Sequence, residues 1–289
     1  MRLSKIALMA ALGLGMPLQA VAATKPAPAA PAAKVEGPDI SGVWEIYPDP
    51  FAGDENTFKE LPVPNGGPKL KEPFASQWKA KRADRDAKIA AGTPLADPST
   101  LCLPEGMPSI MGAIFPLQIL QTPGQVTVLA EFLTQTRRIL LGKTMPPDDE
   151  LSPNYYGYSV GRWEGDTLVV TTAGVREDVQ FFEIPHSGKM QITERIRLTA
   201  PGYLEDQITV EDPETLQEPY RFSYGYKLNP EYEIKEYLCD KEDPLFKVND
   251  DGTVSMKTDA TNGAAPAPAT AAAAPAPAAT APAGKGKKK

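Results

Sequence analysis

The stretch from residue 125 to residue 239 constrains the fold most. In it, short segments rich in Thr, Val, Ile and Tyr follow one another with turn residues between them. Turns at Glu164-Gly-Asp, Ala200-Pro-Gly and Asn229-Pro230 separate neighbouring segments, which is typical of sequential β-hairpins. An earlier segment, residues 40–46, has apolar residues at a period of two and is the first predicted strand. The nine predicted strands cover residues 40–46, 126–132, 136–141, 156–163, 167–172, 190–199, 203–211, 220–228 and 232–239.

A sheet of nine short strands leaves two unpaired edges unless it closes on itself. We therefore predict an all-β fold, an antiparallel up-and-down barrel, with a β-sandwich as the alternative. One helix is predicted over residues 74–91, with Gly92 placed to end it. Its apolar residues Phe74, Trp78 and Ile89 form only a thin stripe, so we expect the helix to lie on the surface of the barrel.

The two ends of the chain differ in composition from the middle. Residues 1–22 have the basic start, apolar run and small residues of a secretory signal peptide, with a retained N-terminal anchor as the alternative. Residues 23–36 form an Ala/Pro linker, residues 37–246 the barrel domain, and residues 247–289 a disordered Ala/Pro-rich tail with a Lys-rich end. These features predict a periplasmic or secreted protein.

The charge of the chain limits its partners. The eight bases in residues 1–34 and 261–289 leave 22 bases against 37 acids in the middle, a net charge of −15. Such a surface repels nucleic acid, so we predict a small-molecule ligand instead. The Lys-rich end either makes weak contact with an anionic envelope or membrane surface or serves only as a solubilising tail. One His and two Cys exclude a zinc finger, and we predict no cofactor and no metal site.

Several short motifs stand at turns and strand ends. They are Cys102-Leu-Pro-Glu-Gly-Met-Pro108, Gln121-Thr-Pro-Gly-Gln-Val-Thr127, Gly161-Arg-Trp-Glu-Gly-Asp-Thr-Leu-Val-Val170, His186-Ser187, Glu194-Arg195, Glu211-Asp-Pro213 and Glu236-Tyr-Leu-Cys239. In these motifs, over residues 40–243, the chain resembles a large family of uncharacterised exported bacterial proteins. Gly42-x-Trp44 gives a weaker similarity to lipocalin-like barrels. The resemblance implies a fold and an exported compartment but no activity.

Cys102 and Cys239 are the only cysteines. Two cysteines in an oxidising compartment usually pair, and no basic residue closely flanks either one to favour a reactive thiol. We predict a disulfide between them, with free thiols as the alternative.

Acidic residues interrupt the apolar alternation of the later strands. Glu194 shares a face with Ile192 and Ile196, and Asp206 shares one with Leu204 and Ile208. If Leu198 pairs with Leu204 across the turn, the two acids are diagonal neighbours inside the barrel. Glu236, Arg162 and Arg137 are expected to face inward with them by the same alternation. The group is either a structural ion-pair network or the polar floor of a ligand site.

The only histidine and a row of aromatic residues complete the candidate site. His186 lies just before the strand of Glu194 and is a candidate general base with Glu194 or Asp206. Tyr158 and Tyr224, in aromatic-rich strands, are either core or the wall of an apolar pocket, and Trp163 supports that wall. Met107 and Met111 are expected to form an adaptable lid at the barrel mouth.

These observations allow three functions. The first is binding of a small apolar or amphipathic ligand in a barrel cavity. The second is acid–base catalysis by an isomerase, lyase or hydrolase that uses His186 with Glu194 or Asp206. The third is an envelope-associated structural protein with a filled interior.

Overall fold

The structure, a computed structural model, describes residues 34–50, 63–239 and 246–256. The predicted signal peptide at residues 1–22, the linker up to residue 33 and the tail after residue 256 lie outside the described residues. Among the residues that are described, no helix is long and apolar enough to cross a membrane.

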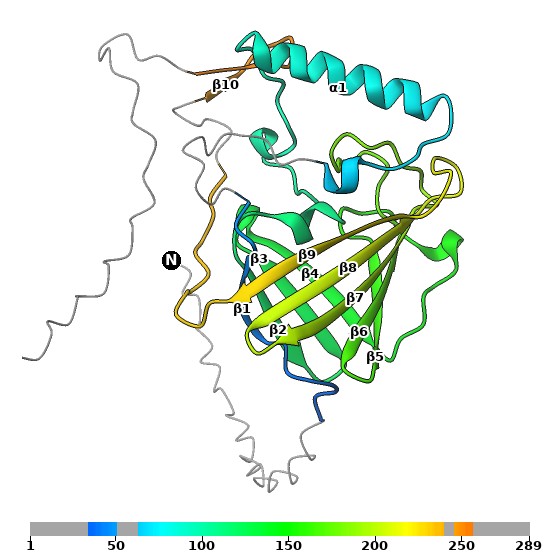
Figure 1. Cartoon of the computed structure of the whole chain (residues 1–289), viewed down its shortest axis with the longest axis vertical. Helices are drawn as coiled ribbons and strands as arrows, with labels where there is room; N and C mark the ends of the chain where they lie inside the picture. Colours follow the sequence, from blue (N-terminus) through cyan, green and yellow to red (C-terminus); the bar gives the residue numbers. More distant parts are fainter. Residues whose placement is uncertain (1–33, 51–62, 240–245, 257–289) are drawn as a thin grey trace, which may run out of the picture. The chain divides into compact units, whose positions relative to one another are not determined.

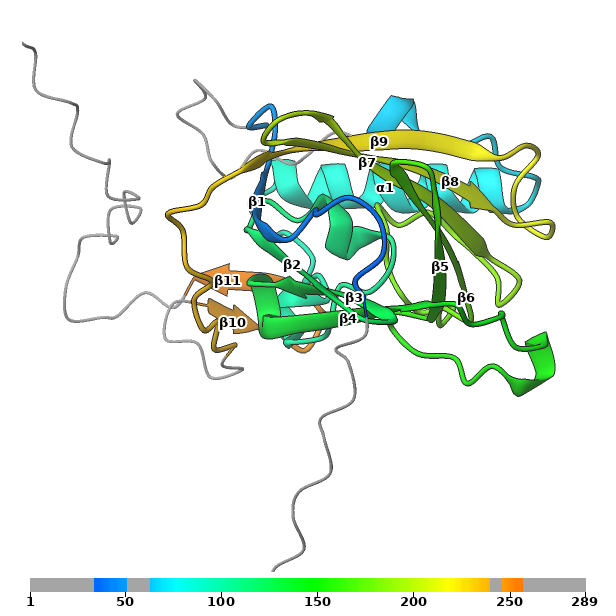
Figure 2. The same cartoon turned by 90° about the horizontal axis from the view of Figure 1, so that it is seen from below.

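Nine strands form a closed barrel in sequence order, which confirms the predicted all-β barrel with one helix (Figure 1). β1 pairs with β2 on one side and with β9 on the other, so the ring has no free edge (Figure 2). The barrel strands are β1 (Gly42–Ile46), β2 (Leu117–Thr122), β3 (Gln125–Ala130), β4 (Gln135–Leu141), β5 (Tyr158–Glu164), β6 (Thr167–Ala173), β7 (Gln191–Ala200), β8 (Tyr203–Glu211) and β9 (Tyr220–Leu228).

One neighbouring pair departs from the predicted antiparallel order, because β4 and β5 run parallel. An odd number of strands cannot alternate in direction all the way round a closed ring, so at least one pair must be parallel. A parallel pair needs a long crossover instead of a tight turn, and residues 142–157 provide it.

The ninth strand is not the one predicted from the sequence. Residues 232–239 have no strand structure, and β2, which the sequence reading missed, takes the ninth place. The edge of β9 is already paired with β1, so no edge remains for a strand after it. Glu131 fixes the segment after β9 instead, by accepting hydrogen bonds from the Tyr232 hydroxyl (2.9 Å) and the Lys235 backbone N–H (2.8 Å).

The predicted pairing of the β7–β8 hairpin is confirmed residue by residue. Leu198 lies opposite Leu204, Ile196 opposite Asp206, and Glu194 opposite Ile208. Side chains on β8 alternate between buried and more exposed positions, which places the apolar residues and Asp206 inside the barrel.

Over the described residues, one α-helix and a short hairpin lie outside the ring of strands. α1 (Phe74–Ala90) has no buried residue, in agreement with its thin apolar stripe. β10 (Phe246–Val248) and β11 (Val254–Met256) pair with each other, and Leu95 in the chain after α1 forms a bridge with Thr253. This hairpin extends past residue 246, the predicted end of the barrel domain.

Candidate functional site

A cluster of three charged residues, Arg137, Glu194 and Asp206, lies inside the barrel. We call it the charge cluster. The side chains of Arg137 on β4 and Glu194 on β7 are both 0% exposed. They form a two-bond ion pair, in which Arg137 Nη1 donates to Glu194 Oε1 (2.7 Å) and Nη2 donates to Oε2. Nη2 also lies 3.0 Å from Thr172 Oγ1 and 3.3 Å from Ser159 Oγ. These contacts compensate the burial of one positive and one negative charge.

Asp206 is the member of the charge cluster whose burial is not compensated by hydrogen bonds. It is fully buried, and both of its carboxyl oxygens lack a hydrogen-bond donor from the described residues. Burial raises the pKa of Asp206 well above its ordinary value, and the neighbouring Glu194 carboxylate raises it further, against the opposing effect of Arg137. These effects favour the protonated form of Asp206. The cluster then has one cation, one anion and one neutral acid, and is neutral overall.

A row of aromatic side chains on β9 faces the cluster. Tyr220, Phe222 and Tyr226 are buried, and Tyr224 stands directly opposite Asp206 in the β8–β9 pairing. Successive rings are in contact, with centroid distances of 5.0 Å from Tyr220 to Phe222 and 5.6 Å from Phe222 to Tyr224. The predicted inward position of Tyr224 is confirmed.

The interior is closed at one end by residues 105–112, which we call the plug. Met107, Ile110 and Met111 are 0–1% exposed, so these methionines are part of the core and not the adaptable lid that we expected. The Tyr226 hydroxyl donates to the Met111 carbonyl (2.6 Å). A β-carbon added at Gly112 would lie 2.5 Å from the Tyr224 hydroxyl oxygen, so only glycine fits where the plug meets the aromatic row.

A second segment, residues 176–188 between β6 and β7, covers the plug; we call it the lid loop. α1 holds this loop through Trp78, whose Nε1 donates to the Phe182 carbonyl (3.0 Å), and through Arg82 and Arg85, which each lie 3.1 Å from the Glu183 carboxylate. Phe182 and Glu183 have φ angles of 51° and 53°. Two consecutive non-glycine residues in this region store local strain.

A small apolar chamber lies between the lid loop and the barrel strands. Its free volume is about 20 Å³, and the polar residues of its wall are His186, Asp212 and Thr215. The apolar wall combines residues of the lid loop, the residue just before β7, and residues of β8, β9 and the turn between them, namely Phe181, Ile184, Met190, Val210, Leu216 and Tyr220. An open surface groove of about 600 Å³ shares Asp212 and Leu216 with the chamber and therefore adjoins it.

His186 lies in this wall and not in the charge cluster. Its Nε2 lies 2.9 Å from the Val179 carbonyl oxygen, and its Nδ1 lies 3.4 Å from that of Ser187. An imidazole N–H donating to Val179 fits this geometry. Within the part of the chain that the structure describes, His186 makes no hydrogen bond to Glu194 or Asp206. The structure therefore does not assemble the predicted general-base pair.

Asp212 joins two of the sequence motifs, a role that our reading of the sequence missed. Its carboxylate accepts bonds from the Ser187 backbone N–H (2.6 Å), the Ser187 hydroxyl (2.9 Å) and the Glu214 backbone N–H (2.9 Å). Burial acts to raise the pKa of Asp212, but these bonds outweigh it and lower that pKa. The Asp-Pro sequence at the end of β8 was a signal for such a side-chain-capped turn.

Three predicted interior residues lie outside the barrel. The Arg162 side chain is 65% exposed and pairs with Glu164, and Tyr158 shares its outer face. We predicted that the face of β5 with Tyr158 and Arg162 points into the barrel, and this is wrong. Arg137 and Ile139 fill the adjacent interior and leave space only for small residues there, since a β-carbon at Gly161 would lie 2.8 Å from Ile139. Glu236 is exposed, since its segment is not a strand.

Trp163 lies on the inner face of β5, opposite the buried Leu168, at the end of the strand. Its ring packs on the chain before β1, where a β-carbon at Gly37 would lie 2.2 Å from the indole. Trp163 therefore closes that end of the barrel and supports the wall without lining the chamber.

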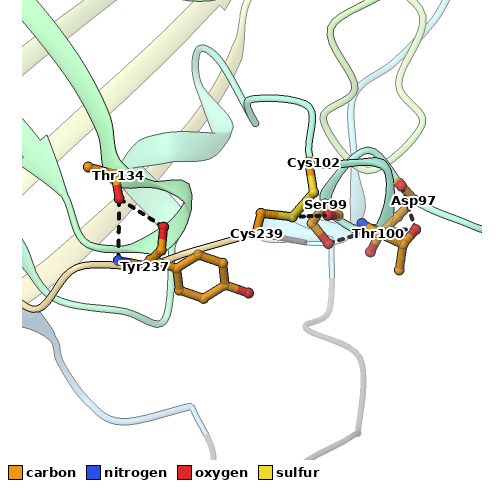
Figure 3. Close-up of a disulfide and its surroundings, with 7 residues drawn as sticks. All are labelled: Asp97, Ser99, Thr100, Cys102, Thr134, Tyr237 and Cys239. Carbon is orange, nitrogen blue, oxygen red and sulfur yellow. Dashed lines mark hydrogen bonds between the residues drawn. A yellow bond between two sulfur atoms is a disulfide. The ribbon is translucent and has the colours of Figure 1, made fainter. Parts of the chain in front are cut away.

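The predicted disulfide between Cys102 and Cys239 is present, with the two α-carbons 5.6 Å apart (Figure 3). It joins the chain just before the plug to the segment after β9. We had predicted that this segment, which contains Cys239, is the last strand of the barrel, but it is not a strand. Beside it, the Thr134 hydroxyl donates to the Tyr237 carbonyl (3.0 Å), and the Tyr237 N–H donates back to that hydroxyl (3.3 Å). The disulfide and this pair both anchor the segment after β9.

Over residues 34–50, 63–239 and 246–256, no group of three or more His, Cys, Asp or Glu side chains is arranged to hold a metal ion. In comparisons with known proteins, no family model matches the chain, and no curated protein matches it in sequence.

Proposed function

We propose that the protein is an exported barrel that binds a small apolar or amphipathic molecule beneath the lid loop. The observation that carries the proposal is the chamber. Apolar side chains of the lid loop and of the inner barrel face meet there and form an apolar surface like that of many small-molecule sites. The free volume of about 20 Å³ is too small for such a ligand, so binding requires the lid loop to move outward and withdraw Phe181.

The contacts that α1 makes with the lid loop support such a movement. Its strained residues Phe182 and Glu183 are held mainly by side chains of α1, a surface helix without buried residues. The adjoining open groove gives a ligand a route to the chamber. The signal-peptide-like N-terminus and the disulfide support a periplasmic or secreted location.

The test is the binding of a neutral fluorescent probe, N-phenyl-1-naphthylamine, to the full chain. Val210→Trp fills the chamber, and Gln207→Trp is its control on the outer face of the same strand. We expect Val210→Trp to weaken binding at least tenfold and Gln207→Trp to leave it unchanged. Absence of binding to the unsubstituted protein, or equal binding to both variants, would overturn the proposal.

A second candidate function is a structural one, an envelope-associated barrel with a filled interior. The observation that favours it is the plug, whose buried Met107, Ile110 and Met111 occupy space that a ligand would otherwise take. A protein that binds no probe, and whose native mass spectrum after purification from its own host shows no bound small molecule, would support this function. Acid–base catalysis by His186 is less favoured, because His186 contacts neither Glu194 nor Asp206.

A further inference from the structure

The interior of the barrel has an unbalanced set of charges. Arg137 on β4 is the cation, and Glu194 on β7 and Asp206 on β8 are the acids. Arg137 is committed to Glu194 through two hydrogen bonds. The Coulomb interactions of Asp206 with Arg137 and Glu194 oppose each other. When Asp206 is ionised, the cluster therefore has one negative charge that no other buried cation in the described part of the chain balances.

The groups that face Asp206 favour a cation over an anion. Tyr224 lies opposite it on β9, and Tyr226 lies opposite its near neighbour Leu204. Tyr226 is buried and Tyr224 is partly buried, and both phenols are neutral, since burial raises the pKa of each above its ordinary value. An aromatic ring attracts a cation to its face, and a carboxylate beside two rings is a common setting for an ammonium group. An anion there would be repelled by Glu194.

The chamber and Asp206 are connected along the inner face of the barrel. Val210 lines the chamber and Asp206 lies four residues earlier on the same strand, a span of roughly 14 Å at about 3.4 Å per residue. On β9, the contacting rings of Tyr220, Phe222 and Tyr224 cover the same interval. A ligand with an apolar body in the chamber therefore has a continuous aromatic path for its other end to reach Asp206.

We propose that the interior around Asp206 binds the protonated amine of an amphipathic ligand whose apolar body occupies the chamber; this inference rests on the proposed function. The ammonium group takes the place of the proton on Asp206, and that proton passes to the solvent. The cluster and the bound ammonium group together therefore keep the net charge that the cluster had before binding. The plug must move for this to happen, since Met111 and Gly112 contact the hydroxyls of Tyr226 and Tyr224.

Three probes with the same apolar chain separate this inference from the proposed function. They are octylamine, 1-octanol and octanoate, measured with the full chain by calorimetry at pH 7 in two buffers of different ionisation enthalpy. We expect octylamine to bind at least tenfold more tightly than 1-octanol, with release of about one proton per molecule bound. Octanoate should bind most weakly of the three.

The outcomes are distinguishable. If 1-octanol binds as tightly as octylamine, or if no proton is released, the proposed function survives and the amine site is refuted. If none of the three binds, both fail. Asp206→Asn keeps the shape and neutrality of the protonated acid and should reduce octylamine binding at least tenfold while 1-octanol binding is retained. Glu205→Gln, one residue away on the outer face, is the matched control and should change neither.

Discussion

Glu105, at the start of the plug, should make the stability of the protein depend on pH. Its Oε2 atom is buried and has no hydrogen-bond donor from the described residues. Burial raises the pKa of Glu105 from 4.5 to about 7, against the lowering effect of a hydrogen bond with Gln135, and repulsion from Asp97 adds to the rise. The protonated form of Glu105 is therefore the form that the folded plug favours.

The sign of the effect follows from comparing the folded and unfolded chains. Between pH 4.5 and pH 7 the folded protein keeps a proton that the unfolded chain releases, so the free energy of unfolding falls as the pH rises. The contribution of Glu105 is complete below pH 4.5 and lost above about pH 7. A difference of this size between the two pKa values corresponds to roughly 3 kcal/mol, at about 1.4 kcal/mol per unit.

Glu105→Gln removes the ionisable group and keeps its shape. We expect the variant to match the unsubstituted protein at pH 4.5 and to exceed its unfolding free energy by up to roughly 3 kcal/mol at pH 8. Urea unfolding followed by tryptophan fluorescence at pH 4.5, 6 and 8 measures this difference. The exposed Glu150→Gln is the control and should show none. Parallel pH curves for Glu105→Gln and the unsubstituted protein would refute the reasoning.

Two further changes test the disulfide and the charge cluster. Replacing Cys102 and Cys239 together by serine removes a crosslink across a sequence separation of 137 residues. Its loss should lower the unfolding free energy by about 5 kcal/mol in the chain-entropy model, and an equal urea midpoint with and without the crosslink would contradict that. Arg137→Met leaves Glu194 buried without a cation and should cost about 3 to 5 kcal/mol at pH 7. Combining it with Glu194→Gln should recover part of this loss, and a double variant no more stable than Arg137→Met would argue against a buried ion pair.

The sequence predicted the β7–β8 hairpin and its inward acids because two conditions coincided there. Each strand has apolar residues on one face alone, and the short turn at Ala200-Pro-Gly leaves little freedom in the pairing. The positions of Glu194 and Asp206 therefore followed directly. The β5 strand met only the second condition: it joins β6 through a short turn, but its apolar residues lie on both faces, with Tyr158 and Val160 on one and Trp163 on the other.

The plug and the last strand were harder to predict for a different reason. The plug is a buried segment whose regular structure is limited to the 3-10 helix Ser109–Gly112, which is too short to show a period that would reveal burial. The segment at residues 232–239 has the alternation of a strand, but whether a strand forms depends on a free edge, and β1 already occupies the edge of β9. Such long-range competition cannot be seen in a local pattern.

The connection between β1 and β2 contains the plug, which fills one end of the barrel. β1 ends at Ile46, β2 begins at Leu117, and the two strands are adjacent and antiparallel, with Trp44 opposite Leu117. A hairpin turn of a few residues would be sufficient to join them. α1, the first cysteine of the disulfide and the whole plug thus belong to one insertion. A shortened chain without this insertion would keep all nine barrel strands but would be open at the end that the plug fills. The plug could therefore be redesigned separately from the strands.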